Sequence, residues 1–313
     1  MAFRAPSADM GFVGFCQFEI NTGSGFRKIQ SRVQSFDLGL SQEIRKPNVI
    51  NISYDRPVHH IQPEVVEGKI KFPILNCDNP SGLFGASVPD PTSDLWYLAT
   101  SRNYYGRLKS FDVLTKYSAV NASFRYKQCY VDTFTFQTQV DEPINVSVDI
   151  KGFTRREENF TTIPAASNSS IAMWYNAFVT LRNSEYILDG IDLRNLTVKV
   201  ENNIERFHTA NGKLVPQDLV PRHRNIQGEI TTLGRIPIIS QYARDNSSRA
   251  VEDTQLDFGY VNSGYTFRGT IPNVILEVEE IALTNDVLET KMKWHSLPAD
   301  NDITDYSVFG GSV

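Results

Sequence analysis

The sequence contains little of what a disulfide scaffold, a zinc site or a membrane anchor would require. Its three cysteines, Cys16, Cys77 and Cys129, are odd in number and show neither CxxC nor Cys/His spacing. Such usage disfavours a disulfide framework or a zinc site and favours a reducing compartment. The apolar stretch 11–20 is interrupted by polar residues. Because a membrane span needs ~20 apolar residues, neither a signal peptide nor a span is expected.

Catalytic motifs are also missing from the sequence. None of the five histidines occurs in the HExxH or H-x₃-H spacing of a metal site. His59 and His60 are adjacent, so on a strand they would point to opposite faces. The glycines of segment 21–25 lack the Lys-Ser/Thr pair of a phosphate-binding loop, and no G-x-S-x-G elbow occurs. The sequence therefore predicts a non-enzymatic protein without catalytic residues, cofactor or metal.

The sequence has fewer basic than acidic residues, with 31 Lys and Arg against 36 Asp and Glu. The formal net charge is −5 and the sequence pI is about 5.6. Proteins that wrap nucleic acid need clustered Lys and Arg to displace counterions from the phosphates. The charge balance therefore disfavours such wrapping and suits a surface that polyanions pass without sticking.

What the sequence does contain is the pattern of β-strands. Apolar residues alternate with polar ones over 36–40 and over 145–150, which is typical of strands with one buried face. The turn clusters 141–143 and 284–286 each separate two such runs. A length of 313 residues favours about two domains. We therefore expect an all-β fold with minor α, built of antiparallel hairpins.

The alternating pattern occurs twice along the chain. A displacement of 160 residues places Phe36 on Leu196 and Gly68 on Gly228. Near the end of each half, Phe134 matches Leu276 at a displacement of 142, while strand 144–150 matches 288–294 at 144. The second turn is therefore expected to be two residues longer. We predict two tandem β-sandwich or barrel domains.

Each domain is expected to contain one helix. The first follows the N-cap cluster 90–93 and includes Leu95, Trp96, Leu98 and Ala99. The second is predicted over 240–253. The expected boundaries are 1–155 for the first domain, 156–172 for a linker, 173–297 for the second domain and 298–313 for a C-terminal arm.

Two polar segments, 41–60 and 201–224, are flanked by strands and are interpreted as long hairpin excursions, which are unusual unless they bind something. Their basic residues have two interpretations, solubility or a patch that meets an acidic surface on a neighbouring subunit. The candidate contact residues are Arg45, Lys46, His59, His60, Arg206, Arg222 and Arg224.

This pattern resembles the bacteriophage tail tube module, which shares its fold with type VI secretion tube proteins. The similarity is carried by residues 33–39 and 146–153 and covers both halves without a diagnostic short motif. The resemblance implies rings whose inner strands join into one barrel, stacked into a hollow tube that conducts DNA. A doubled module departs from the usual single one and implies three chains in a pseudo-six-fold ring, with a hexamer as the alternative.

Further expectations follow from the resemblance. The loops 41–60 and 201–224 and the arm would contact the next ring. Candidate lumen-facing residues are Asn145, Ser147, Asp149, Glu277 and Glu279. Expected partners are further copies of the chain and other tail proteins, namely sheath or terminator, tape measure and baseplate. Genomic DNA would pass without specific binding. The expected location is the virion tail, after assembly in the host cytoplasm.

Two alternative functions remain open at this stage. One is another tail component with the same module, such as a hub, tube initiator or distal tail protein. The other is a carbohydrate-binding β-sandwich adhesin, for which Tyr104–Tyr105 and Trp174–Tyr175 would be the exposed aromatic candidates.

Overall fold

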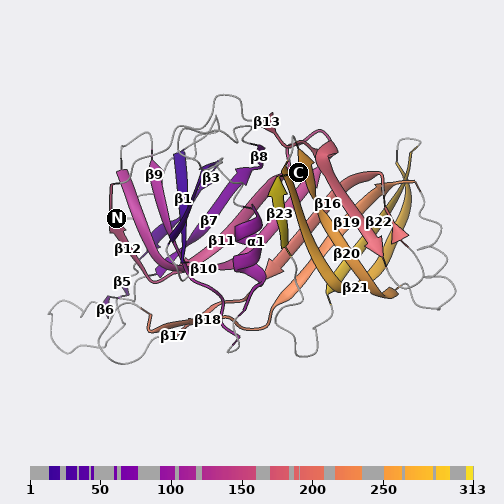
Figure 1. Cartoon of the computed structure of the whole chain (residues 1–313). Helices are drawn as coiled ribbons and strands as arrows, with labels where there is room; N and C mark the ends of the chain where they lie inside the picture. Colours follow the sequence, from indigo (N-terminus) through magenta and orange to yellow (C-terminus); the bar gives the residue numbers. More distant parts are fainter. Residues whose placement is uncertain are drawn as a thin grey trace.

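The computed structural model is a β protein with minor α, as the sequence predicts (Figure 1). The structure describes residues 14–21, 26–33, 35–41, 44–45, 60–61, 65–76, 92–102, 106–117, 122–159, 170–182, 187–189, 191–207, 216–234, 250–262, 265–284, 287–296 and 308–312.

In the first half of the chain, alternation of apolar and polar residues produces strands with one buried face. The elements are β1 (Gly14–Asn21), β2 (Phe26–Val33), β3 (Ser35–Phe36), β4 (Gly39–Ser41), β5 (Ile44–Arg45), β6 (His60–Ile61), β7 (Val65–Pro73), β8 (Leu75–Asn76), α1 (Thr92–Thr100), β9 (Phe111–Tyr117), β10 (Ala122–Gln139), β11 (Asn145–Gly152) and β12 (Thr154–Glu157).

The second half is also built of strands. Its elements are β13 (Ser170–Ile171), the short 3₁₀ helix η1 (Trp174–Asn176), β14 (Ala177–Arg182), β15 (Ile187–Leu188), β16 (Leu193–Glu201), β17 (Glu205–Phe207), β18 (Asp218–Val220), β19 (Asn225–Leu233), β20 (Ala250–Asn262), β21 (Tyr265–Thr284), β22 (Val287–Ser296) and β23 (Val308–Ser312).

One large antiparallel sheet runs through both halves. Its order is β3 and β4, then β7, β11, β10, β16, β19, β22 and β21. The long strands β10 and β21 continue beyond this sheet and pair there with β9 and β20, which makes the strand system barrel-like. The first four positions of the large sheet come from the first half and the last four from the second.

The strand register repeats between the halves. Phe36 stands opposite Ile70 in the first half, and Leu196 stands opposite Ile230 in the second. Both pairs differ by the displacement of 160 residues that the sequence shows. The small hairpins repeat likewise, because the β5–β6 pair Arg45–His60 corresponds to the β17–β18 pair Glu205–Val220.

The terminal hairpins also correspond, although the sequence comparison misplaced one of their strands. Phe134 of β10 lies opposite Val148, and Val278 of β21 lies opposite Met292. The equivalent of Phe134 is therefore Val278 and not Leu276, and the expected two-residue lengthening of the second turn is wrong. The period of two explains the error, because Leu276 and Val278 are two residues apart in β21 and a two-residue slip leaves an alternating apolar pattern unchanged.

The hydrophobic core is shared by the two halves. Trp96 of α1 packs edge-on against Phe134 of β10 at 5.5 Å and against Phe258 of β20 at 5.1 Å between ring centroids. Figure 1 shows α1 between the strands of the two halves. The predicted first helix is therefore confirmed, and its apolar residues hold the halves together through one continuous cluster.

Three other boundaries differ from expectation. The second predicted helix is wrong at its end, because residues 250–253 belong to β20; residues 240–249 lie outside the described residues. The expected linker begins and ends in strands, since β12 pairs with β10 and β13 pairs with β8. The C-terminal arm includes β23, which pairs with β21.

The repeated glycines lie where two paired strands approach each other too closely to leave room for a Cβ atom. A Cβ atom at Gly228 would lie 1.9 Å from the Thr197 carbonyl oxygen and 2.6 Å from Trp294 Cζ2. At Gly68 it would lie 2.0 Å from the Asp37 carbonyl oxygen. Because the obstacle is backbone, neither strand can yield without distorting the ladder.

We predict that Gly228→Ala lowers the free energy of unfolding by about 3 kcal/mol, because the added methyl would clash with the Thr197 backbone and the Trp294 ring. Urea unfolding of the purified chain measures the effect. Glu229→Ala, on the neighbouring residue, loses only its partly exposed ion pair with Lys291 and should cost less than about 1 kcal/mol. Equal stability of the two variants would show that β19 and β16 leave room for a side chain at Gly228.

Candidate functional site

The outer face of the large sheet is polar, because each of its strands buries every second residue. In β11 the buried residues Val146, Val148 and Ile150 alternate with half-buried polar ones. Strands β7, β10, β16, β19 and β22 alternate in the same way over this sheet. We call this surface the polar face; its charged members include Glu67, Lys69, Lys71, Asp149, Lys151, Lys199, Glu201, Glu229, Glu289, Lys291 and Lys293.

The structure brings most of the predicted lumen-facing residues to this sheet. Asn145, Ser147 and Asp149 follow one another on the polar face of β11. Glu277 is exposed on β21 and lies opposite Lys293 of β22. Glu279 lies on β21 at the register shift, and its side chain is outside the described residues. That these residues face a lumen stays a prediction.

Charges of both signs alternate on the polar face. Asp149 lies opposite Lys69, and Lys291 Nζ lies 3.1 Å from Glu229 Oε1. Burial raises the pKa of Asp149, although the positive charge of Lys69 acts in the opposite direction. The lysines thus have carboxylates beside them, so this face does not form the unopposed basic stripe that grips phosphates.

The two halves meet where β10 pairs with β16, over seven residue pairs from Thr133–Glu201 to Gln139–Asn195. We call this junction the seam. Asn202, fully buried just after β16, donates from Nδ2 to the carbonyl oxygens of Ala99 at 2.9 Å and Val131 at 3.0 Å. The side chain of Asn202 thereby ties α1 and β10 to the second half.

Charged groups complete the seam. The Ile204 backbone N–H donates to Asp132 Oδ1 at 2.6 Å. Lys151 Nζ donates to the Ile204 carbonyl oxygen at 2.9 Å and lies 2.8 Å from Asp132 Oδ2. Sequence reasoning missed Asn202, just after β16, and Asp132, at a register shift within β10, because a polar residue carries no sign of a partner that is distant in sequence.

The predicted basic contact residues are dispersed. Arg206 forms an ion pair of 2.6 Å with Glu67 of the first half, and Arg222 is paired with Glu205 and lies over the Phe207 ring. These contacts are intramolecular. Arg224 is half-buried, and the β5–β6 ladder places Arg45 opposite His60. Lys46 and His59 lie outside the described residues. An inter-ring role for these residues stays a prediction.

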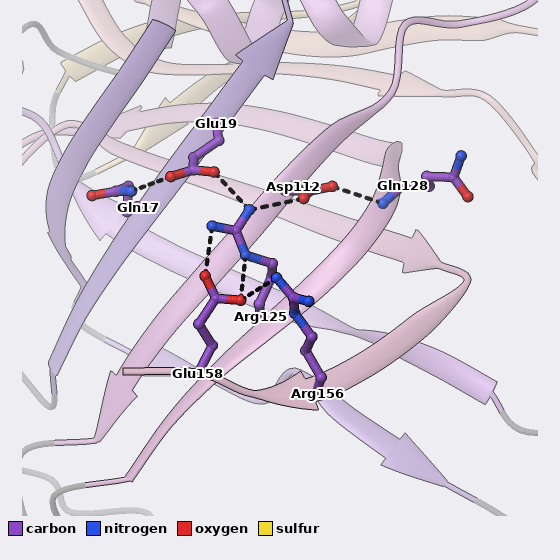
Figure 2. A network of polar contacts seen from close by, with 7 residues as sticks. All are labelled: Gln17, Glu19, Asp112, Arg125, Gln128, Arg156 and Glu158. Atoms are coloured by element: carbon purple, nitrogen blue, oxygen red, sulfur yellow. Dashed lines mark hydrogen bonds and ion pairs between the residues drawn. The ribbon is translucent and has the colours of Figure 1, made fainter. Parts of the chain in front are cut away.

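A second polar site lies on the outer strands of the first half. Figure 2 shows the guanidinium of Arg125 (β10) among the carboxylates of Glu19 (β1), Asp112 (β9) and Glu158. Arg125 Nη1 donates to Glu19 Oε2 at 2.6 Å and to Asp112 Oδ2 at 3.0 Å. Its Nε and Nη2 reach the two oxygens of Glu158, each at 2.9 Å. We call these four residues the Arg125 network.

The network also fixes the backbone around it. Asp112 Oδ1 accepts from the backbone N–H of Gln128, which has a left-handed φ of 49° at a register shift in β10. Burial alone would lower the pKa of Arg125, but the hydrogen bonds that Arg125 donates to Glu158, Glu19 and Asp112 outweigh it and raise that pKa. The guanidinium is thus a permanent charge that joins three strands and the segment after β12.

The second half carries a cluster of the opposite arrangement. Asp257 of β20 is fully buried and lies 2.5 Å from Nη2 of both Arg182 and Arg268. Burial would raise the pKa of Asp257, but hydrogen bonds from Thr270, Arg268 and Gln255 outweigh it and lower that pKa. One carboxylate here holds two cations, whereas in the Arg125 network one cation holds three carboxylates.

In both clusters several groups of opposite charge hold one central charge, which is the chemistry of structural ties. Within the described ranges, no group of three or more His, Cys, Asp or Glu residues is arranged to hold a metal ion. Among the helices of the described part, none has the length and apolarity to cross a membrane.

These features define an all-β protein with minor α in which one large antiparallel sheet runs through both halves of the chain. Comparison with protein families makes the assignment specific: the family model described as phage tail tube protein matches residues 12–289. The chain belongs to the phage tail tube protein family, a structural component of the virion tail. The resemblance inferred from the sequence is thus confirmed. A search of curated proteins found no match.

We predict that Arg125→Met destabilises the chain by about 3–5 kcal/mol, because it leaves Glu19, which is 5% exposed, without its cation. The matched control is Arg156→Met. Arg156 also contacts Glu158 but is 55% exposed, so its loss should cost less than about 1 kcal/mol. Chemical unfolding at neutral pH compares the two, and equal losses would contradict a central role for Arg125.

The Asp257 cluster predicts a pH dependence. Since the folded-state pKa of Asp257 lies below its unfolded value of about 3.9, its stabilisation is complete above that value. The stabilisation is lost as the pH falls through the folded-state pKa. Asp257→Asn should therefore be less stable at pH 7 by about 3 kcal/mol and should lose less stability below pH ~4. Urea unfolding from pH 7 to 2 tests this; parallel curves for both proteins would refute it.

Proposed function

We propose that the chain consists of two tail-tube modules and that three chains form a closed ring with pseudo-six-fold symmetry. The rings stack into a hollow tube through which genomic DNA passes during ejection. The family establishes a tail tube role. The number of chains in a ring follows from the arrangement of the two halves.

The observation that carries the proposal is the seam. The two halves repeat the same strand order and register, and they stand side by side in one sheet through β10 and β16. A junction that sets one module beside its equivalent can be repeated until the sheet closes. Six modules in a closed sheet correspond to three chains.

The polar face supports the assignment of the lumen. The opposite face of the large sheet is occupied by the core, so the polar face is the one free to line a channel. Its mixture of charges suits passage of DNA, since phosphates meet carboxylates as well as lysines, as at Lys291 beside Glu229. The net charge of −5 also disfavours retention of DNA, because it repels the phosphates.

Negative-stain electron microscopy together with native mass measurement of the purified chain tests the proposal. We expect rings or stacked hollow tubes, and a smallest ring of about three times the 35.4 kDa chain mass. Bovine serum albumin at the same concentration serves as the control for particles that arise from staining.

Two results would count against the proposal in different ways. A chain that stays monomeric at every concentration and ionic strength contradicts self-assembly through the sheet. Hollow rings of six chains retain the tube but overturn the three-chain stoichiometry.

A further inference from the structure

The hairpin β17–β18 of the second half lies on the first half. Figure 1 shows both strands below α1 and β10. Leu219 of β18 and Ile204, just before β17, are buried in a small apolar cluster with Leu108, which precedes β9. Tyr130 and Phe153, also from the first half, pack against this cluster. The described part of segment 201–224 is therefore anchored within the chain.

Each strand of this hairpin also forms an ion pair with the first half. Arg206 Nη2 of β17 lies 2.6 Å from Glu67 Oε2 of β7, and Asp218 Oδ2 of β18 lies 2.9 Å from Arg107 Nη2. These pairs are partly exposed, so burial of the apolar cluster supplies most of the attraction and the charges select the partner. We call the apolar cluster and the two ion pairs the brace.

Pairing of β10 with β16 does not by itself fix the angle between the halves. Neighbouring strands are rotated relative to each other over a range of about 25° among sheets. A closed ring of six modules turns by about 60° at each junction, whereas a ring of eight modules turns by about 45°. This difference of about 15° lies within the range that strand pairing permits. A contact outside the sheet is therefore needed to select one angle.

The charges of the brace belong to the junction within the chain. The hairpins β5–β6 and β17–β18 share one register at the displacement of 160 residues, so Arg206 corresponds to Lys46. At the same displacement Glu67 corresponds to Gln227. With the halves exchanged, a lysine would therefore meet an amide in place of a carboxylate. This difference favours an ionic tie inside one chain over an equivalent tie between chains.

We propose that the brace sets the angle between the two halves and thereby limits the ring to three chains. The inference rests on the proposed function, because it adds what selects the size of the proposed ring. Three of the six junctions in such a ring lie within chains, and the brace holds these at one angle before the chains meet. The curvature of the ring is thus encoded inside each chain.

Hydrogen exchange of the unassembled chain tests whether the brace holds the hairpin. Leu219→Ala removes most of a side chain that is 2% exposed, so the amides of residues 203–205 should exchange at least about tenfold faster. Phe207→Ala is the matched control, because Phe207 is 38% exposed and contacts Arg222 within the same hairpin. Its exchange at 203–205 should change by less than about threefold. Circular dichroism checks that both variants keep their strands.

Native mass measurement and electron microscopy of the assembled protein test the ring size. We expect three-chain rings from the wild type and from Phe207→Ala, and a mixture that includes larger rings or open arcs from Leu219→Ala. Arg206→Glu keeps the apolar cluster but sets two carboxylates against each other, so it should also broaden the distribution. The charge exchange Glu67→Arg/Arg206→Glu should restore rings of three chains.

The outcomes separate the brace from the tube. Uniform three-chain rings from both Leu219→Ala and Arg206→Glu, or exchange at 203–205 that Leu219→Ala leaves unchanged, would overturn the brace and leave the proposed function intact. If wild-type chains form neither rings nor tubes, the proposed function fails, and control of ring size by the brace fails with it.

Discussion

The pairing of β10 with β16 is the interaction on which the architecture depends. Seven residue pairs carry the large sheet from the first half of the chain into the second. Because Trp96 packs at the same place against strands of both halves, removal of the pairing would also open the shared core. Backbone hydrogen bonds fix direction and register, while apolar burial provides most of the favourable free energy.

The seam also joins two halves that repeat the same strand register, edge to edge in one sheet. An unpaired strand edge favours aggregation, whereas an edge with a matching partner extends the sheet in an ordered way. In this chain the covalent link between the halves makes the junction of β10 with β16 intramolecular. The phage tail tube family assignment gives this arrangement its biological setting.

The two ionic clusters show that the halves of the chain are held by different chemistry. Arg125 gathers three carboxylates in the first half, whereas Asp257 gathers two guanidinium groups in the second. In each case the central group is shielded from water and the partners saturate it. The cost of removing the central group exceeds that of removing a peripheral one, since an unpaired buried charge is left behind.

The sequence by itself determined the β class, the repeated apolar pattern of the two halves, the first helix and the resemblance to tail tube modules. These features depend on local periodicity and on spacing along the chain, as in the displacement that joins Gly68 to Gly228. Periodicity failed at β21, where a two-residue slip leaves the alternating apolar pattern unchanged, and over 250–253, where a predicted helix is strand. Local pattern does not record what a strand edge pairs with. Only the tertiary structure decided that Asn202 bridges α1 and β10, that α1 packs between the halves, and that β10 pairs with β16. Those properties arise from residues far apart in sequence, brought together by hydrogen bonds and burial that no single segment encodes.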